Sequence, residues 1–241
     1  MFSQATYEAI IKRCKALAEK LRNLVNAVHD KVEHALSLMP VVFQWLLDKI
    51  NDLLEKIYAA FTKFWEILVD YFEGMLAPIT FYARAQSWYS DVQSPMVKLG
   101  SDVDSDHVLK PGQWEGKGGN SYRNSVSDQS AACNAVATMA GTVGSTLTKC
   151  AVGGLVFYGA IVFVLIKMIA GVGAGTGATA TGVGAPVGLL TILSSIGIGS
   201  AEIGLLITAA VGLVTAQMTA FDELNKGFAA FPLSRWPSAT D

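Results

Sequence analysis

The charged residues of this 241-residue chain are distributed very unevenly, and this constrains its fold more than any other feature. Residues 1–149 hold 31 of the 38 charged side chains, and residues 150–241 hold the remaining seven. Lys167 and Glu202 are the only charged residues in 150–221, and none lies between them. A segment of this length with so little charge has to be buried in protein or in lipid.

The N-terminal third is predicted to form amphipathic helices. In 6–38, and again after Pro40, apolar residues recur every three or four positions, which is the spacing of one helix face. A third, shorter helix is expected from 78 to 92. The first stripe comprises Ile10, Cys14, Leu17, Leu21, Leu24, Val28 and Ala35, and the second Phe43, Leu47, Ile50, Leu54, Ile57, Phe61, Phe64, Leu68, Tyr71 and Met75. The opposite face of the first helix mixes acids and bases, so we expect a protein neighbour: a partner helix or a second copy.

The remainder alternates between loop-like and apolar segments. Gly, Pro and Asp residues predict a loop after the third helix, and a helix rich in small residues should follow it. Two stretches of the apolar region, 151–169 and 187–214, are each long enough to cross a bilayer core of about 30 Å. The expected segments are bundle helices in 1–93, a loop in 94–120, a small-residue helix in 121–149, an apolar Gly-rich hairpin in 150–220 and a polar tail in 221–241. The fold class is therefore all-α, an elongated helical bundle.

Composition and motifs exclude several function classes. Slightly more acid than base, without a cluster of Lys or Arg, argues against nucleic-acid binding. No motif of a hydrolase, metalloprotease or kinase is present, so we expect no catalytic residue, and the glycine repeats lack the residues of a nucleotide site. We expect neither a cofactor nor a metal site, because the aspartates at 102, 104 and 106 lack the Gly and Glu of a calcium loop. Cys133 and Cys150 either pack among apolar residues or form a disulfide.

The apolar hairpin contains two features that suit a membrane. An ionised carboxylate at bilayer depth costs about 2.5 to 3.5 kcal/mol, so Glu202 needs a partner, and Lys167 is the candidate. This intramembrane pair would form across the hairpin or between protomers. Small residues at intervals of four allow apolar helices to approach closely. The glycines predicted to serve this packing are Gly173, Gly177, Gly184, Gly188, Gly204 and Gly212.

One segment resembles a known family. Trp114 and Gly116 form a Trp-x-Gly motif between two predicted helices, and Tyr122, Val126 and Gln129 follow it at helical spacing. This part of the chain resembles the second half of a WXG100 protein. The resemblance implies a helical hairpin with the Trp-x-Gly motif at its turn, and export by a type VII (ESX) secretion system. The export signal of the family, Tyr-x-x-x-Asp/Glu, has no match after Trp114.

These observations lead to three hypotheses of function. The first is a non-enzymatic, type VII secretion-associated protein that binds partner helices and associates with a membrane. The second is a pore-forming or membrane-permeabilising effector resembling colicin-type toxins. The third is a plain integral membrane protein with two spans and both termini in the cytoplasm, because the loop between the spans lacks Lys and Arg. All three predict a cell-envelope or membrane-associated protein with lipid contacts, and the first adds secretion.

Overall fold

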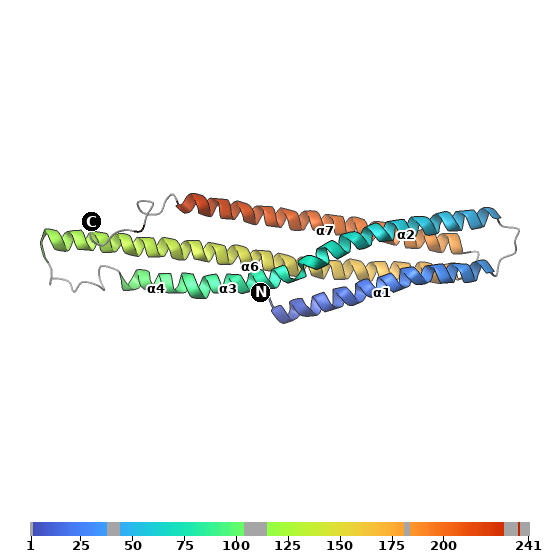
Figure 1. The fold of residues 1–241 in the computed structure, drawn as a ribbon, viewed down its shortest axis with the longest axis horizontal. Helices are drawn as coiled ribbons and strands as arrows, with labels where there is room; N and C mark the ends of the chain where they lie inside the picture. The colour runs from blue at the N-terminus through green and yellow to red at the C-terminus, as the bar shows by residue number, and fades with distance from the viewer. Residues whose placement is uncertain (1, 38–43, 104–114, 181–183, 229–235, 237–241) are drawn as a thin grey trace. The chain divides into compact units, whose positions relative to one another are not determined.

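The computed structural model describes residues 2–37, 44–103, 115–180, 184–228 and 236, and every regular element in these ranges is helical. The all-α fold predicted from the sequence is therefore confirmed (Figure 1). In chain order the elements are α1 (Gln4–Ser37), α2 (Gln44–Glu73), the 3-10 turn η1 (Gly74–Leu76), α3 (Ala77–Ser87), the π-helical turn η2 (Trp88–Gln93), α4 (Ser94–Asp102), α6 (Lys117–Thr179) and α7 (Ala185–Phe228).

The chain divides into two units. Unit 1 consists of Met1–Ala77 and Gly153–Val211, and unit 2 of Pro78–Val152 and Gly212–Asp241. Helix α6 runs without interruption from Lys117 to Thr179, so the predicted boundary between 149 and 150 is not a break in secondary structure.

Unit 1 is a bundle of four helical segments. Helices α1 and α2, which we call the cover, lie along residues 153–179 of α6 and 185–211 of α7, which we call the apolar hairpin (Figure 1). Helix α1 begins at a Ser cap, because Thr6 donates its backbone N–H to the Ser3 hydroxyl at 3.3 Å. Helix α7 begins with Pro186 in its first turn, where a missing N–H costs no hydrogen bond.

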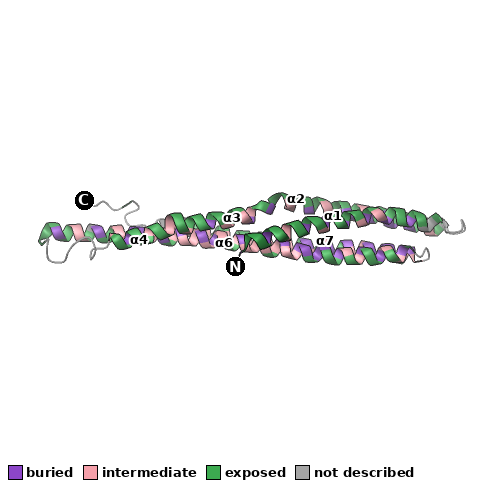
Figure 2. Cartoon of the chain, turned by 90° about the horizontal axis from the view of Figure 1, so that it is seen from below, coloured by how far each residue is buried: buried purple, intermediate pink, exposed green. Residues whose placement is uncertain are grey.

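The cover buries the apolar stripes that the sequence predicts. In α2 the predicted residues from 50 to 68 are all buried, and Met75 extends the row into η1. In α1 the buried face is rotated slightly about the helix axis relative to the predicted stripe. Cys14, Leu21 and Val28 are buried as expected, whereas the other described members of the predicted stripe are half-buried. Their places in the core are taken by Tyr7, Ala18, Val25 and Val32. Figure 2 shows exposed residues on the outer side of both helices.

Two predicted loops are partly helical. The predicted loop 94–120 contains α4 at its start, and α6 already begins at Lys117. Pro95 signalled a helix break, but it occupies the first turn of α4, where proline is favoured. The glycines from 171 to 177 lie between the two predicted spans but belong to α6, because packing of α6 on α7 compensates for their low helix propensity.

Helices α6 and α7 approach each other through glycines, but not mainly through those predicted. A Cβ atom on Gly175 would lie 2.6 Å from the carbonyl oxygen of Gly188, so the two backbones are nearly in contact. Gly188 is therefore the one predicted packing glycine that lies at this contact. Gly173, Gly177, Gly204 and Gly212 have no heavy atom within 4 Å of such a Cβ, so they do not lie at the contact between α6 and α7, and their role in helix packing stays a prediction. Gly184 accepts the Gly188 N–H in the first turn of α7.

Gly175→Ala is expected to destabilise unit 1 by about 1 to 3 kcal/mol, because the new methyl group would overlap Ile192 and the Gly188 backbone. Gly177→Ala is the matched control, since it lies in open space on the same helix and should gain up to about 1 kcal/mol of helix propensity. Chemical denaturation of both variants measures the difference. Equal unfolding midpoints would mean that α6 and α7 are not packed at this contact.

Candidate membrane-interaction site

The apolar hairpin is covered on one side and open on the other. The most apolar 18-residue window of α6 is 39% buried and that of α7 only 17% buried, and both helices are long and apolar enough to cross a membrane. The exposed side chains recur at helical spacing, and we call this surface the open face. It comprises Val156, Phe163 and Ile166 of α6, and Val187, Leu190, Ile198 and Leu205 of α7.

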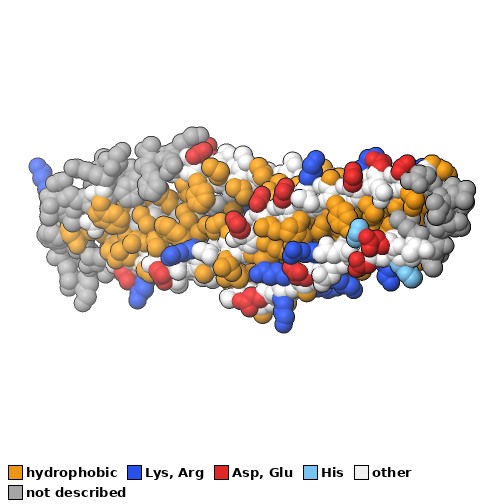
Figure 3. All heavy atoms as spheres, turned by 45° about the vertical axis from the view of Figure 1, so that its right-hand side comes forward, with side chains coloured by type: hydrophobic (Ala, Val, Ile, Leu, Met, Phe, Trp, Pro, Cys, Tyr) orange, Lys and Arg blue, Asp and Glu red, His pale blue; other side chains and the backbone are white. Residues whose placement is uncertain are grey.

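The open face is far more apolar than the surface of the cover. Leu205 is 72% exposed, Val156 66% and Phe163 63%, although residues of these types are normally buried. Figure 3 shows one side of the molecule, on which hydrophobic side chains lie among acidic and basic ones. Large exposed apolar side chains that share one side of a helix are typical of sites of contact with protein or membrane.

Lys167 and Glu202 form an ion pair between α6 and α7, so the structure places the two predicted partners together. Lys167 also lies over the ring of Phe163, with its Nζ atom 5.7 Å from the ring centroid. The side chains are 46% and 32% exposed, which limits the pair to about 0 to 1 kcal/mol of stability in water. In lipid the same contact would spare Glu202 its much larger desolvation cost.

Tyrosine residues join the cover to the apolar hairpin. Tyr158 of α6 donates its hydroxyl hydrogen to the backbone carbonyl of Tyr71 in α2, at 2.7 Å. The Tyr158 ring also packs edge-on against Tyr7 of α1, with ring centroids 5.9 Å apart. Tyr7 in turn donates a 2.7 Å hydrogen bond to the Met75 carbonyl in η1, directly after α2. One cluster therefore holds α1, α2 and α6 together.

Cys14 is buried in α1 beside this cluster. Burial raises the pKa of its thiol to about 12, so the reactive thiolate is almost absent at neutral pH. Burial also raises the pKa of Tyr7, with smaller contributions from Tyr158 and Cys14. The described cysteines at 133 and 150 are also free, so the alternative of a disulfide between them is not realised.

Unit 2 contains a helical hairpin with Gly116 at its turn. Ser130 of α6 donates a hydrogen bond to the Gly100 carbonyl of α4, and Gly144 lies against Tyr89 of η2. In each of these two pairs, one residue lies before position 116 and the other lies about equally far after it in the sequence. This is the register of an antiparallel hairpin. Gly116 has φ of +96°, a conformation that favours glycine, and α6 begins at the next residue. Trp114 lies outside the described residues.

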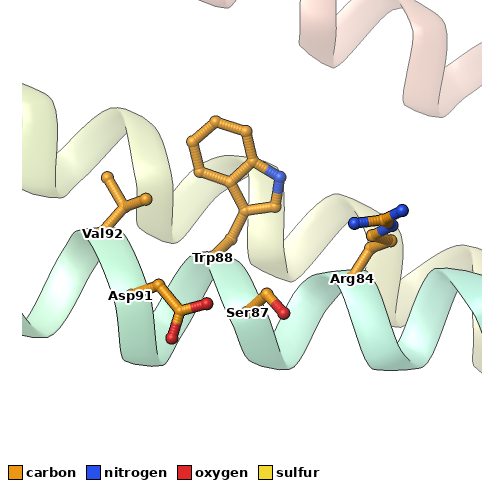
Figure 4. A pocket seen from close by; sticks show the side chains of 5 residues that line it. All are labelled: Arg84, Ser87, Trp88, Asp91 and Val92. Atoms are coloured by element: carbon orange, nitrogen blue, oxygen red, sulfur yellow. The ribbon is translucent and has the colours of Figure 1, made fainter.

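The described residues of unit 2 also line surface pockets. The first, about 240 Å³, is lined by residues of α3 and η2 only (Figure 4). Arg84, Trp88 and Val92 point to one side of this helical run, and Asp91 points away from them. The second, about 430 Å³, lies among η2, α6 and α7 and has a polar lining that includes Lys149. The described residues contain no group of three or more metal-ligating side chains.

Sequence reasoning identified the ion pair but missed the open face and the polar pocket. The signal for the open face was present in the spacing of seven and three residues between Val156, Phe163 and Ile166, which is that of one helix face. In a uniformly apolar segment, however, this spacing does not show which side a neighbour covers. Comparison with protein-family models, with curated proteins and with solved structures finds no match. The function therefore has to be argued from the geometry of the chain itself.

Proposed function

We propose that this protein inserts its apolar hairpin into a lipid bilayer from a water-soluble state in which α1 and α2 cover one side of the hairpin. The observation that carries the proposal is the open face on α6 and α7, with its exposed Val156, Phe163 and Leu205. This surface gives a bilayer an apolar area to bind before any helix has to move.

The charged surface of the cover favours a protein that changes from a soluble to a membrane-inserted state over one that is permanently integrated in the membrane. Helix α1 carries ten charged side chains and α2 carries nine, and they include the exposed ion pair of Asp52 with Lys56. If the hairpin crossed a bilayer while the cover stayed packed on it, these charged surfaces would enter lipid. Each charged group at bilayer depth costs about 2.5 to 3.5 kcal/mol, so spanning by the hairpin requires the cover to leave it.

The hairpin has the dimensions that insertion requires. Residues 153–179 form a continuous helical segment of about 40 Å at 1.5 Å per residue, and 185–211 form one of the same length. Both exceed the apolar core of a bilayer, about 30 Å. Within these two segments Lys167 and Glu202 are the only charged residues, and their opposite charges are paired.

Mixing the purified full-length chain with lipid vesicles tests this proposal. The expected result is a fraction that floats with the vesicles and resists extraction by alkaline carbonate, while the same protein without vesicles remains in solution. Dye release from the vesicles reports in addition whether insertion permeabilises the bilayer. If the protein stays in solution in the presence of vesicles, or is removed completely by carbonate, the hairpin does not insert and the proposal is wrong.

Tyr158→Phe is expected to increase insertion about fivefold. It removes the hydrogen bond between the hairpin and the Tyr71 carbonyl of the cover, and such a bond contributes about 1 kcal/mol net. Tyr58→Phe is the control, because the Tyr58 hydroxyl interacts with the His29 backbone inside the cover. The carbonate-resistant fraction of each variant is compared with that of the unmodified chain. A larger effect of Tyr58→Phe would show that contacts inside the cover limit insertion.

A second candidate function is that of a type VII secretion substrate whose unit 2 hairpin binds a partner helix. The observations that favour it are the antiparallel packing of α4 and η2 along α6 and the φ of +96° at Gly116, directly before α6. Export is tested by looking for the protein in the culture medium of producing cells, with and without an active type VII system. Export that continues after the system is disabled would exclude this candidate.

A further inference from the structure

The polar pocket of unit 2 is built by an unusual helical turn. In the π-helical turn η2, Tyr89 and Gln93 both face α6, where Gly144 and Gly141 lie opposite them. A Cβ atom on Gly144 would lie 2.7 Å from the Tyr89 ring, so larger residues at these positions would push η2 away from α6. Turns of π-helix are often found at functional sites. The pocket of about 430 Å³ is within the range of ligand sites.

Thr146 supplies an unused hydrogen-bonding group to this pocket. The residue lines the pocket and is only 2% exposed, and its hydroxyl makes no hydrogen bond with any described residue. In the described part of the chain, no fully enclosed side-chain oxygen or nitrogen lacks a partner. The Thr146 hydroxyl is therefore not enclosed by protein but is open to the pocket. A ligand atom in the pocket can therefore accept a hydrogen bond from the Thr146 hydroxyl, which has no other protein partner among the described residues.

The charge of the residues that line this pocket favours an anionic ligand. Lys149 is the only charged residue that lines the pocket, and no described Asp or Glu joins it there. Ser145 and Gln93 add further groups that can donate hydrogen bonds. Hydroxyl, amide and ammonium donors around one cation match the oxygens of a phosphate group.

The pocket also lies next to the segment that would enter lipid. Lys149 precedes the predicted span 151–169 by two residues on the continuous helix α6. When that span crosses a bilayer, Lys149 and Thr146 are at the depth of the lipid headgroups. We propose that the pocket binds the phosphate oxygens of an anionic phospholipid headgroup, with Thr146 and Lys149 as the main ligands. This inference rests on the proposed function, because insertion brings the pocket to the membrane surface.

Vesicle binding by the full-length chain tests the pocket. Affinity is compared for vesicles of phosphatidylcholine alone and for vesicles that also contain phosphatidylglycerol. Thr146→Val keeps the shape and charge of the residue but removes its hydroxyl, and we expect it to reduce the preference for phosphatidylglycerol about tenfold. Thr148→Val is the matched control on the same helix, because the Thr148 hydroxyl donates to the Gly144 carbonyl and does not line the pocket.

Lys149→Gln provides a second variant at an exposed position, where substitutions usually change stability by less than about 0.5 kcal/mol, and it should reduce the preference about fivefold. Competition by soluble glycerol phosphate distinguishes recognition of a free phosphate group from recognition of a lipid headgroup at the membrane. If it reduces binding of the unmodified chain to phosphatidylglycerol vesicles but not that of Thr146→Val, the pocket recognises the phosphate group itself. If it does not compete while the effect of Thr146→Val persists, the pocket recognises the headgroup only at the membrane. Both results support the inference.

Equal lipid preference of Thr146→Val and Thr148→Val would overturn the inference, as would a lack of any preference in the unmodified chain. Insertion into phosphatidylcholine alone, measured by resistance to carbonate, reports separately on the proposed function. A chain that inserts without lipid preference refutes the pocket and leaves the proposed function intact. A chain that shows the Thr146-dependent preference but is removed by carbonate refutes insertion and leaves the pocket intact.

Discussion

Replacing Lys167 by Met is expected to lower insertion of the apolar hairpin into vesicles about a hundredfold. The substitution leaves Glu202 without its ion-pair partner in a segment that has no other charge. An unpaired carboxylate at bilayer depth costs about 2.5 to 3.5 kcal/mol, and each 1.4 kcal/mol is a factor of about ten in an equilibrium. The soluble state should hardly change, because the pair is partly exposed there and contributes about 0 to 1 kcal/mol.

The double variant Lys167→Met, Glu202→Leu provides the control for this prediction. It removes both charges, so it should insert at least as well as the unmodified chain, whereas each single substitution should impair insertion. The carbonate-resistant fraction, measured over a range of lipid concentrations, gives the affinities of the unmodified chain, the two single variants and the double variant, and the double-mutant cycle gives the coupling of the pair. Single variants that insert normally would show that this part of the hairpin stays in water.

The Cys14 thiol is expected to react with a maleimide about a thousandfold more slowly in the folded protein in water than in the unfolded chain. Its pKa is raised by burial from 9.0 to about 12, and the thiolate is the reactive form. Burial against the Tyr7 cluster also blocks the reagent. Because α1 carries this thiol into the core of unit 1, its rate of reaction reports whether the cover is in place.

This measurement uses a chain with Cys133→Ala and Cys150→Ala, so that Cys14 is the single thiol. The matched control moves the thiol by two residues to the exposed side of α1, by Cys14→Ala with Ala16→Cys in the same background. The thiol at position 16 should react at the rate of a free cysteine in water. Similar rates at the two positions would show that α1 is not packed on its neighbours.

Periodicity and charge in the sequence predicted the helices and the ion pair for physical reasons that the structure makes clear. In α2, large apolar residues such as Ile50, Phe64 and Leu68 alternate with charged ones, so a single helix face satisfies the pattern and is buried. Lys167 and Glu202 could be paired because the apolar region offers neither of them another charged partner. The stripe of α1 was less well predicted, since smaller apolar residues surround it and allow several rotations of the helix.

The remaining features depend on contacts between segments that are distant in sequence. Gly175 and Gly177 are equivalent in the sequence, but only Gly175 faces α7. The polar pocket depends on the π-helical turn η2, which presents Tyr89 and Gln93 to glycines of α6, and no local pattern predicts such a turn. The open face is defined by which side of the hairpin the cover leaves exposed, and this is a property of the tertiary packing.

The reaction of the Cys14 thiol in the presence of vesicles tests the central claim most directly, because insertion of the hairpin requires the cover to leave it. The account predicts that vesicles raise the rate at Cys14 toward that of the exposed thiol at position 16, in step with the carbonate-resistant fraction. If the hairpin becomes resistant to carbonate while Cys14 stays as protected as it is in water, the cover remains packed and the account is contradicted.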